Sequence, residues 1–303
     1  MMWAAAVASA SIMTRSSSTP RPRRITPARI AGALLALVVA AYAAALLFLV
    51  TQETRLVFQA GRPLSENRPS FPYEQVEVPR ADGAGQFAWV MRSPAATAWV
   101  LFLHGNSATV ASRVNIARYA ELRALGLNVV APEYRGFAGL EGIPSEPSVT
   151  EDARATYDYL TRTMQVSPTR LVIYGWSLGS AVAVNLASQS ASAAVILEGA
   201  PASLVSIGEQ QYPFFPIRLI MRNPFESISK IERVRAPVLF LHSPEDEIIP
   251  LGEGRRLYER ANQPKRFVEV KGGHIYPHER DRAVFFGAIR SFLDDHGLLG
   301  HQE

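Results

Sequence analysis

The sequence predicts an α/β fold with a mostly parallel sheet, and one membrane helix before it. From residue 75 onward, short apolar runs alternate with longer segments of helical periodicity, and a single long apolar segment ends at residue 50. The short runs are apolar throughout instead of alternating with polar residues. Such strands are typical of a parallel sheet that helices cover on both faces.

Composition limits the possible functions. The chain has 303 residues, of which 48% are hydrophobic and 19% charged, so it can form one large globular domain or two small ones. It contains no cysteine, which excludes disulfides, thiolate metal sites and a cysteine nucleophile.

The net charge of +4 is concentrated at the N-terminus. Residues 1–29 hold five arginines and no acidic residue, so residues 30–303 together carry a net charge of −1. A nearly neutral body offers no basic surface for phosphates, and we do not expect a nucleic-acid partner. Arginines that precede an apolar segment are instead a signal of membrane topology.

Residues 28–50, ARIAGALLALVVAAYAAALLFLV, are predicted to form a transmembrane signal-anchor. A helix over Ile30–Val50 spans about 30 Å, the thickness of a bilayer core. The positive-inside rule predicts a cytoplasmic N-terminus and an extracytoplasmic body. The alternative is secretion after signal-peptide cleavage near Ala41-Tyr42-Ala43. Residues 1–27, rich in Ala, Ser, Arg and Pro, are expected to be a disordered basic tail.

The remainder divides into a connector over 51–74, with three prolines, and a folded domain over 75–296. The first two strands have only a short turn, 82–85, between them, so we expect an antiparallel hairpin at one sheet edge. The expected strands are 75–78, 86–92, 98–103, 128–131, 170–174, 194–197, 238–241 and 266–270, and the expected helices are 112–125, 149–164, 178–189, 251–261 and 279–295.

Four strand ends carry unusual residues. They run into the segments His104-Gly105-Asn106, Gly175-Trp176-Ser177-Leu178-Gly179, His242-Ser243-Pro244-Glu245-Asp246 and Lys271-Gly272-Gly273-His274. In α/β folds, ligands gather outside the carboxyl ends of the strands. These side chains are therefore candidates for one site.

A serine on a tight strand-to-helix turn exposes its hydroxyl, and glycines on each side avoid collisions with the neighbouring strand and helix. Ser177 is therefore the candidate nucleophile. His274 is the candidate base and Asp246 the group that orients the imidazole. The backbone N–H groups of Leu178 and Asn106 are candidates for an oxyanion hole.

Several residues compete for these roles. Glu245 and Glu247 lie in the same loop as Asp246, and His278 follows His274 closely. His104 is expected to make structural hydrogen bonds. Glu133, Tyr134 and Arg135 are expected to be structural, and His242 is expected to be a buried strand residue. The acidic and histidine residues lack metal-ligand spacing, so neither a metal nor a cofactor is expected.

Six segments in order, LFLHGNS, APEYRGFAGLEGIPSE, YGWSLGS, YPFFPIRLIMRNPFESISKI, APVLFLHSPEDEIIP and GGH, resemble the α/β-hydrolase superfamily over about 75–295. Together with QETRLVF after the apolar segment, they resemble its small single-pass membrane-anchored branch, which includes bud-emergence-like proteins and protein depalmitoylases. The resemblance implies an eight-stranded mostly parallel sheet, helices on both faces and a short cap at about 200–235. It also favours Asp246, four residues before Pro250, as the acid.

The sequence departs from the family pattern near the expected pocket. Ser180 and Ser243 replace frequent glycines, and Ser107-Ala108 replaces Ala-Gly. The apolar run 212–217 in the cap has two interpretations: it packs over the sheet, or it lines an acyl pocket or touches the bilayer.

These features predict a serine hydrolase that cleaves carboxylic esters or thioesters through an acyl-Ser177 intermediate. The expected partners are the membrane and a small-molecule or lipid acyl substrate. An aminopeptidase-like peptidase and a non-enzymatic binding protein of the same fold are the alternatives. The sequence does not indicate an oligomeric state.

Overall fold

The computed structural model describes residues 26–94 and 96–300, and the predicted basic tail up to residue 25 lies outside them. Internal contacts divide the chain into two units, Met1–Leu47 and Phe48–Glu303. Helix α1, Pro27–Phe58, contributes residues to both.

Helix α1 is long and apolar enough to cross a membrane, with a mean hydropathy of 2.8 in its most apolar window. It continues to Phe58, beyond the predicted end of the span at residue 50. No Gly or Pro interrupts residues 51–58, and Glu53 and Phe58 are buried there while Arg55 is exposed. The non-helical connector therefore begins at Gln59 instead of at residue 51.

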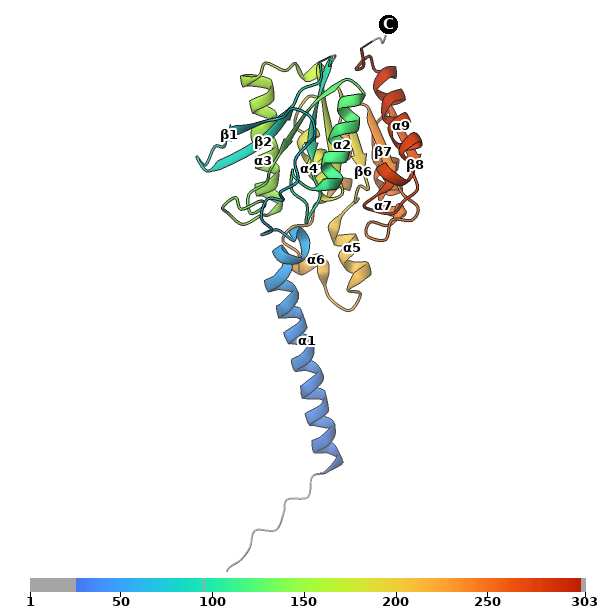
Figure 1. Cartoon of the computed structure of the whole chain (residues 1–303). Coiled ribbons are helices and arrows are strands. Elements are labelled where there is room, and N and C mark those ends of the chain that lie inside the picture. Colours follow the sequence, from blue (N-terminus) through green and yellow to red (C-terminus); the bar gives the residue numbers. More distant parts are fainter. Residues whose placement is uncertain (1–25, 95, 301–303) are drawn as a thin grey trace, which may run out of the picture. The chain divides into compact units, whose positions relative to one another are not determined.

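Eight strands form one sheet in the order β1-β2-β4-β3-β5-β6-β7-β8 (Figure 1). Strand β2 pairs antiparallel with β1 and β4, and the other neighbours are parallel. The predicted mostly parallel sheet and its antiparallel edge hairpin are thus confirmed. The strands are β1 Glu74–Pro79, β2 Gly85–Met91, β3 Ala98–Leu103, β4 Leu127–Pro132, β5 Leu171–Trp176, β6 Ala194–Glu198, β7 Val238–His242 and β8 Lys265–Glu269.

Helices cover both faces of the sheet. Helices α3 Glu146–Asp158, α4 Leu178–Ala187 and α7 Leu251–Arg260 pack on one face, and α2 Arg113–Ala124 and α9 Arg282–Asp295 on the other. Leu101 and Leu103 of β3 belong to the first core, and Val100 and Phe102 to the second. Burial on both faces explains why the central strands are apolar throughout.

Two predicted helices differ in extent from the observed ones. A capping box between Ser145 and Ser148 starts α3 at Glu146, earlier than the predicted 149, and α3 gives way to a π-helical turn over Tyr159–Thr163. The predicted helix 279–295 is broken at Asp281 into α8 Pro277–Arg280 and α9. The Asp281 carboxylate accepts a hydrogen bond from the Lys271 N–H at 3.1 Å, so the break helps to hold the loop that leads to His274.

A buried ion pair connects α2, β6 and that loop. Arg118 is fully buried and donates from Nε to a carboxylate oxygen of Glu198 at 2.9 Å, and the Tyr174 hydroxyl donates to the same oxygen at 2.7 Å. The guanidinium lies 4.4 Å from the centre of the Trp176 ring, a cation–π contact. It also donates to the backbone carbonyl of Ile275 at 3.3 Å. The pair thereby holds the residue that follows His274.

His278 lies beside this pair, with Nε2 3.5 Å from a guanidinium nitrogen of Arg118. Burial, and then the charge of Arg118, lower the pKa of His278 to about 2. The folded protein therefore keeps this imidazole neutral in mildly acidic solution, where the unfolded chain takes up a proton.

Because the folded pKa of His278 is depressed, its contribution to stability is complete above the unfolded value near 6.5 and declines as the pH falls below it, by about 1.4 kcal/mol per pH unit. His278→Gln should therefore make the free energy of unfolding less sensitive to acid. Urea unfolding of the detergent-solubilised chain at about pH 7.5 and about pH 5 measures this difference. Burial also lowers the pKa of His242, so some acid sensitivity should remain. Equal pH sensitivity in variant and wild type would contradict the assignment.

Candidate active site

Ser177 occupies the turn between β5 and α4 and is buried. Its φ of 55° and ψ of −124° are unusual for a residue with a side chain, and its N–H donates to the Glu198 carbonyl at 2.8 Å. A Cβ on Gly179 would lie 2.0 Å from the Leu103 carbonyl oxygen, and one on Gly175 would lie 2.3 Å from the Gly179 carbonyl oxygen. Both glycines are therefore required for the close approach that the sequence predicted.

The structure brings together the three predicted residues. The Ser177 hydroxyl oxygen lies 2.8 Å from Nε2 of His274, and Nδ1 of His274 lies 2.7 Å from a carboxylate oxygen of Asp246. The side chains of His274 and Asp246 are 4% and 2% exposed. A hydroxyl, an imidazole and a buried carboxylate in this order are the arrangement by which an imidazole removes a proton from a nucleophile.

Asp246 is held as an anion. Its other oxygen accepts hydrogen bonds from the backbone N–H groups of Ile248 and Ile249 at 2.9 and 2.7 Å. Burial alone would raise the pKa of Asp246, but the hydrogen bonds from His274 and these N–H groups outweigh it, and the pKa lies below its ordinary value. The carboxylate can therefore stabilise an imidazolium at His274.

The rival residues have other partners. Glu245 accepts a hydrogen bond from the Gly272 N–H at 3.1 Å, and Glu247 from the His274 N–H at 3.2 Å, so both bind the backbone of the histidine loop and not its ring. His278 packs against Arg118, as described above. His242 is a buried strand residue, as expected, with Nε2 2.9 Å from the Ile249 carbonyl. Asp246 is thus the acid in contact with the His274 ring.

The predicted oxyanion donors flank Ser177. Leu178 is the first residue of α4, where N–H groups have no acceptor within the helix. Asn106 follows β3 in the loop that contains Gly105, and a Cβ on Gly105 would lie 3.0 Å from that of Ser177. The Asn106 side-chain amide donates to the Val57 carbonyl at 3.0 Å. Asn106, Ser177 and Leu178 line the same cavity.

His104 and Glu133 support this loop, as expected. Nε2 of His104 lies 2.9 Å from one Glu133 oxygen, and the other oxygen accepts from the Val110 N–H at 3.0 Å. Arg135 binds Asp152 at 2.6 Å. None of these side chains contacts Ser177 among the described residues, so their roles are structural.

The departures from the family pattern do not alter the site geometry. Ser180 donates its hydroxyl to the Gly175 carbonyl at 2.7 Å and to the Glu198 carbonyl at 2.9 Å, behind the turn. The Ser243 hydroxyl accepts from the Glu245 N–H at 3.1 Å. Ser107, with a φ of 54°, donates its N–H to the Phe58 carbonyl at 3.0 Å.

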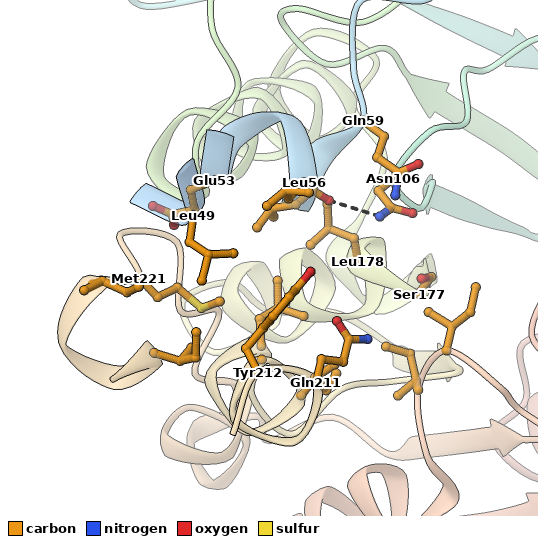
Figure 2. A pocket seen from close by; sticks show the side chains of 18 residues that line it. Leu49, Glu53, Leu56, Gln59, Asn106, Ser177, Leu178, Gln211, Tyr212 and Met221 are labelled. Carbon is orange, nitrogen blue, oxygen red and sulfur yellow. Dashed lines mark hydrogen bonds between the residues drawn. The ribbon is translucent and has the colours of Figure 1, made fainter. Parts of the chain in front are cut away.

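A cavity of about 320 Å³ opens from Ser177. Figure 2 shows Ser177 at one end, Leu49 and Met221 at the other, and Leu56 and Tyr212 between them. Within the described chain, no Lys, Arg or His lines this cavity. The lining residues are Leu49, Glu53, Leu56, Val57, Gln59, Asn106, Ser177, Leu178, Leu204, Ile207, Gly208, Gln211, Tyr212, Ile217, Ile220, Met221, Ile248 and Ile249.

The run 212–217 of the cap contributes side chains both to the cavity and to the exposed surface. The cap folds as two short helices, α5 Leu204–Gln211 and α6 Ile217–Ile220, and Tyr212 and Ile217 line the cavity. Phe214 and Leu219 are each 84% exposed. The cap therefore presents one apolar surface to the cavity and another outward.

Sequence reasoning missed the contribution of α1 to the cavity. Leu49, Glu53, Leu56 and Val57 all precede the predicted folded domain. The run Leu56-Val57-Phe58 indicated packing on the folded domain, and Phe58 is fully buried there, but the run gave no indication of a cavity. No sequence pattern indicated that Glu53 is buried, because an acidic residue after an apolar span is usually exposed to solvent.

Comparisons with known proteins identify similar chains. A family model described as Alpha/beta hydrolase family matches residues 100–225. The uncharacterized protein Rv2307c of Mycobacterium tuberculosis is 35% identical over 272 residues, covering 88% of this chain and 96% of the relative. The lysophosphatidylserine lipase ABHD12 of Danio rerio is 32% identical over 185 residues, covering 55% of this chain and 48% of the relative.

Solved structures share the fold at low identity. The Pyrococcus furiosus esterase Pf2001 superposes with a TM-score of 0.66 at 16% identity, covering 78% of this chain and 97% of that one. A Mycobacterium tuberculosis puromycin-hydrolyzing peptidase gives a TM-score of 0.62 at 19% identity, covering 77% of this chain and 40% of that one. From the sheet order, the family match and these relatives, the chain belongs to the alpha/beta hydrolase family.

Proposed function

We propose that this chain is a serine hydrolase that cleaves carboxylic esters or thioesters through an acyl-Ser177 intermediate. The observation that supports the proposal most directly is the hydrogen-bonded series Ser177–His274–Asp246 at the mouth of an apolar cavity. The lysophosphatidylserine lipase among the similar proteins also supports ester cleavage.

In the proposed reaction, His274 takes the hydroxyl proton as the Ser177 oxygen attacks the substrate carbonyl carbon. The oxyanion of the tetrahedral intermediate accepts hydrogen bonds from the N–H groups of Leu178 and Asn106. His274 then donates its proton to the departing alcohol or thiol, which leaves an acyl-Ser177. Water, deprotonated by His274, attacks this ester and releases the carboxylic acid, and the proton returns to Ser177.

The cavity favours a single acyl chain. Its volume of about 320 Å³ lies at the small end of the range of about 300–1,000 Å³ for ligand pockets. Leu49 and Met221 lie at the end away from Ser177 (Figure 2), and their apolar side chains suit methylene groups. We therefore propose a mono-acyl, lipid-like substrate.

The peptidase alternative requires a carboxylate free to bind the substrate amine. Glu209 pairs with Arg218, and Glu226 accepts from the Ser203 hydroxyl. Glu53 lines the cavity, but its two oxygens accept hydrogen bonds from Arg222 and Asn223. This arrangement favours an ester or thioester over a peptide. The intact triad geometry likewise disfavours a binding protein without activity.

The first test is the nucleophile. Ser177→Ala in the full chain should abolish labelling by a fluorophosphonate probe and reduce hydrolysis of p-nitrophenyl esters by roughly 10⁴–10⁶ in kcat. Ser188→Ala, at the far end of the same helix, is the matched control and should label normally. Continued turnover by Ser177→Ala would end the serine-hydrolase proposal.

The acid is tested within the same assay. Asp246→Asn should lower kcat by about 10⁴, because an amide presents the wrong partner to the imidazole. Glu247→Gln should cost tenfold or less, since its oxygen can still accept from the His274 N–H. A larger loss of kcat in Glu247→Gln than in Asp246→Asn would show that Asp246 is not the acid.

We further propose that α1 is retained as an anchor and that the folded domain lies outside the cytoplasm. The five arginines before the apolar segment, against Glu53 and Arg55 after it, support this orientation. Alkaline phosphatase fused after Glu303 should then be active, whereas a fluorescent protein that matures only in the cytoplasm should stay dark. The reverse pattern would place the domain in the cytoplasm, where acylated cytosolic proteins become the favoured substrates.

A further inference from the structure

The segment that directly follows the apolar span takes part in the cavity. We call residues 48–58 of α1 the juxtamembrane segment, and they belong to the same compact unit as Ser177. Leu49, Leu56 and Val57 of this segment line the cavity. Figure 2 shows Leu56 across the cavity from the cap residue Tyr212. One wall of the cavity therefore comes from outside the predicted folded domain.

Glu53 fastens one end of the segment to the cap. It is 6% exposed, and Oε1 accepts hydrogen bonds from the backbone N–H groups of Arg222 and Asn223 at 2.7 and 2.8 Å. Oε2 accepts from the Arg222 guanidinium at 2.8 Å, and that side chain also donates to the Val50 carbonyl at 3.0 Å. A buried carboxylate with several donors is costly to replace, because each donor would be left unpaired.

The other end of the segment holds the loop of the predicted oxyanion donor. The Val57 carbonyl accepts from the Asn106 side-chain amide at 3.0 Å, and the Phe58 carbonyl accepts from the Ser107 N–H at 3.0 Å. Phe58 itself is fully buried and packs edge-on against Phe225, with the ring centres 5.9 Å apart. The segment thus connects the cap with the loop beside Ser177.

From these contacts we infer that Leu49, Glu53 and Leu56 of the juxtamembrane segment are part of the active site. Leu49 and Leu56 form the acyl-binding wall and set the chain length that the site accepts, and the Glu53 clamp positions the Asn106 loop. This inference rests on the proposed function and adds the residues that select the acyl chain. In Figure 2, Leu56 lies between Ser177 and Leu49, so an acyl group attached to Ser177 and extending toward Leu49 would pass Leu56.

Leu56→Trp tests the wall. The larger side chain should obstruct the path beyond Leu56 and exclude three or four methylenes, each worth about fourfold in binding. The ratio of kcat/KM for p-nitrophenyl octanoate to that for the acetate should therefore fall at least about tenfold. Arg55→Trp places the same side chain on the adjacent exposed position, which does not line the cavity, and should change the ratio less than about twofold.

The two proposals fail differently. A wild-type chain that neither reacts with fluorophosphonate nor cleaves the esters would overturn the proposed function, and with it the acyl-binding wall. A wild type that is active, with Leu56→Trp keeping the wild-type octanoate-to-acetate ratio, would overturn the wall alone. A ratio that falls equally in Arg55→Trp would also contradict it.

Glu53 is tested as a positioning residue with the acetate ester, whose acyl group is too short to reach Leu56. Glu53→Leu should lower kcat about tenfold with little change in KM, because the oxyanion is stabilised less well while ground-state binding is unaffected. Glu53→Gln keeps an oxygen for the Arg222 and Asn223 N–H groups and should recover most of kcat. Wild-type kcat in Glu53→Leu would refute the positioning role, as would equal losses in both variants.

Discussion

The site depends on the close approach of α4 to the end of β3. At Gly179 the gap to the Leu103 carbonyl oxygen admits no side chain, and at Gly175 the helix itself fills the space. A chain that turns within this space must give Ser177 a positive φ, a strained conformation that other contacts have to hold. The N–H of Ser177 and the hydroxyl of Ser180 both bond to the Glu198 carbonyl, which ties the turn to β6.

Glu198 connects this turn to the histidine loop through its side chain. A buried ion pair is a weak source of stability, because desolvation offsets most of the attraction. The Arg118–Glu198 pair is better explained by the positions that it holds. The Glu198 carbonyl accepts from the Ser177 N–H, and Arg118 donates to the carbonyl of Ile275, the residue after His274. The Trp176 indole also donates to the His274 carbonyl at 3.4 Å. The turn that holds Ser177 and the loop that holds His274 are therefore both attached to the buried Arg118–Glu198 pair and its neighbour Trp176.

The sequence predicted those parts of the fold and site that local patterns determine. Continuous apolar runs identified the buried strands, and Ser177, Asp246 and His274 could be grouped because each follows such a strand. The capping box at Ser145 and the break at Asp281 were missed, since the partners that decide them, Ser148 and Lys271, look like ordinary surface residues in sequence. Glu53 was missed because its partners, Arg222 and Asn223, lie about 170 positions away in the chain.

The contribution of α1 to the cavity affects which shortened forms of the chain would keep the candidate site. Cleavage near Ala41-Tyr42-Ala43 would remove most of the span but leave Phe48–Phe58, and therefore the Glu53 clamp and the wall formed by Leu49 and Leu56. An anchored and a secreted form would then have the same active site. A soluble form that begins after Phe58 would lack the wall and the acceptors for Asn106 and Ser107. The proposed active site therefore includes residues of α1 from Leu49 onward, ahead of the connector.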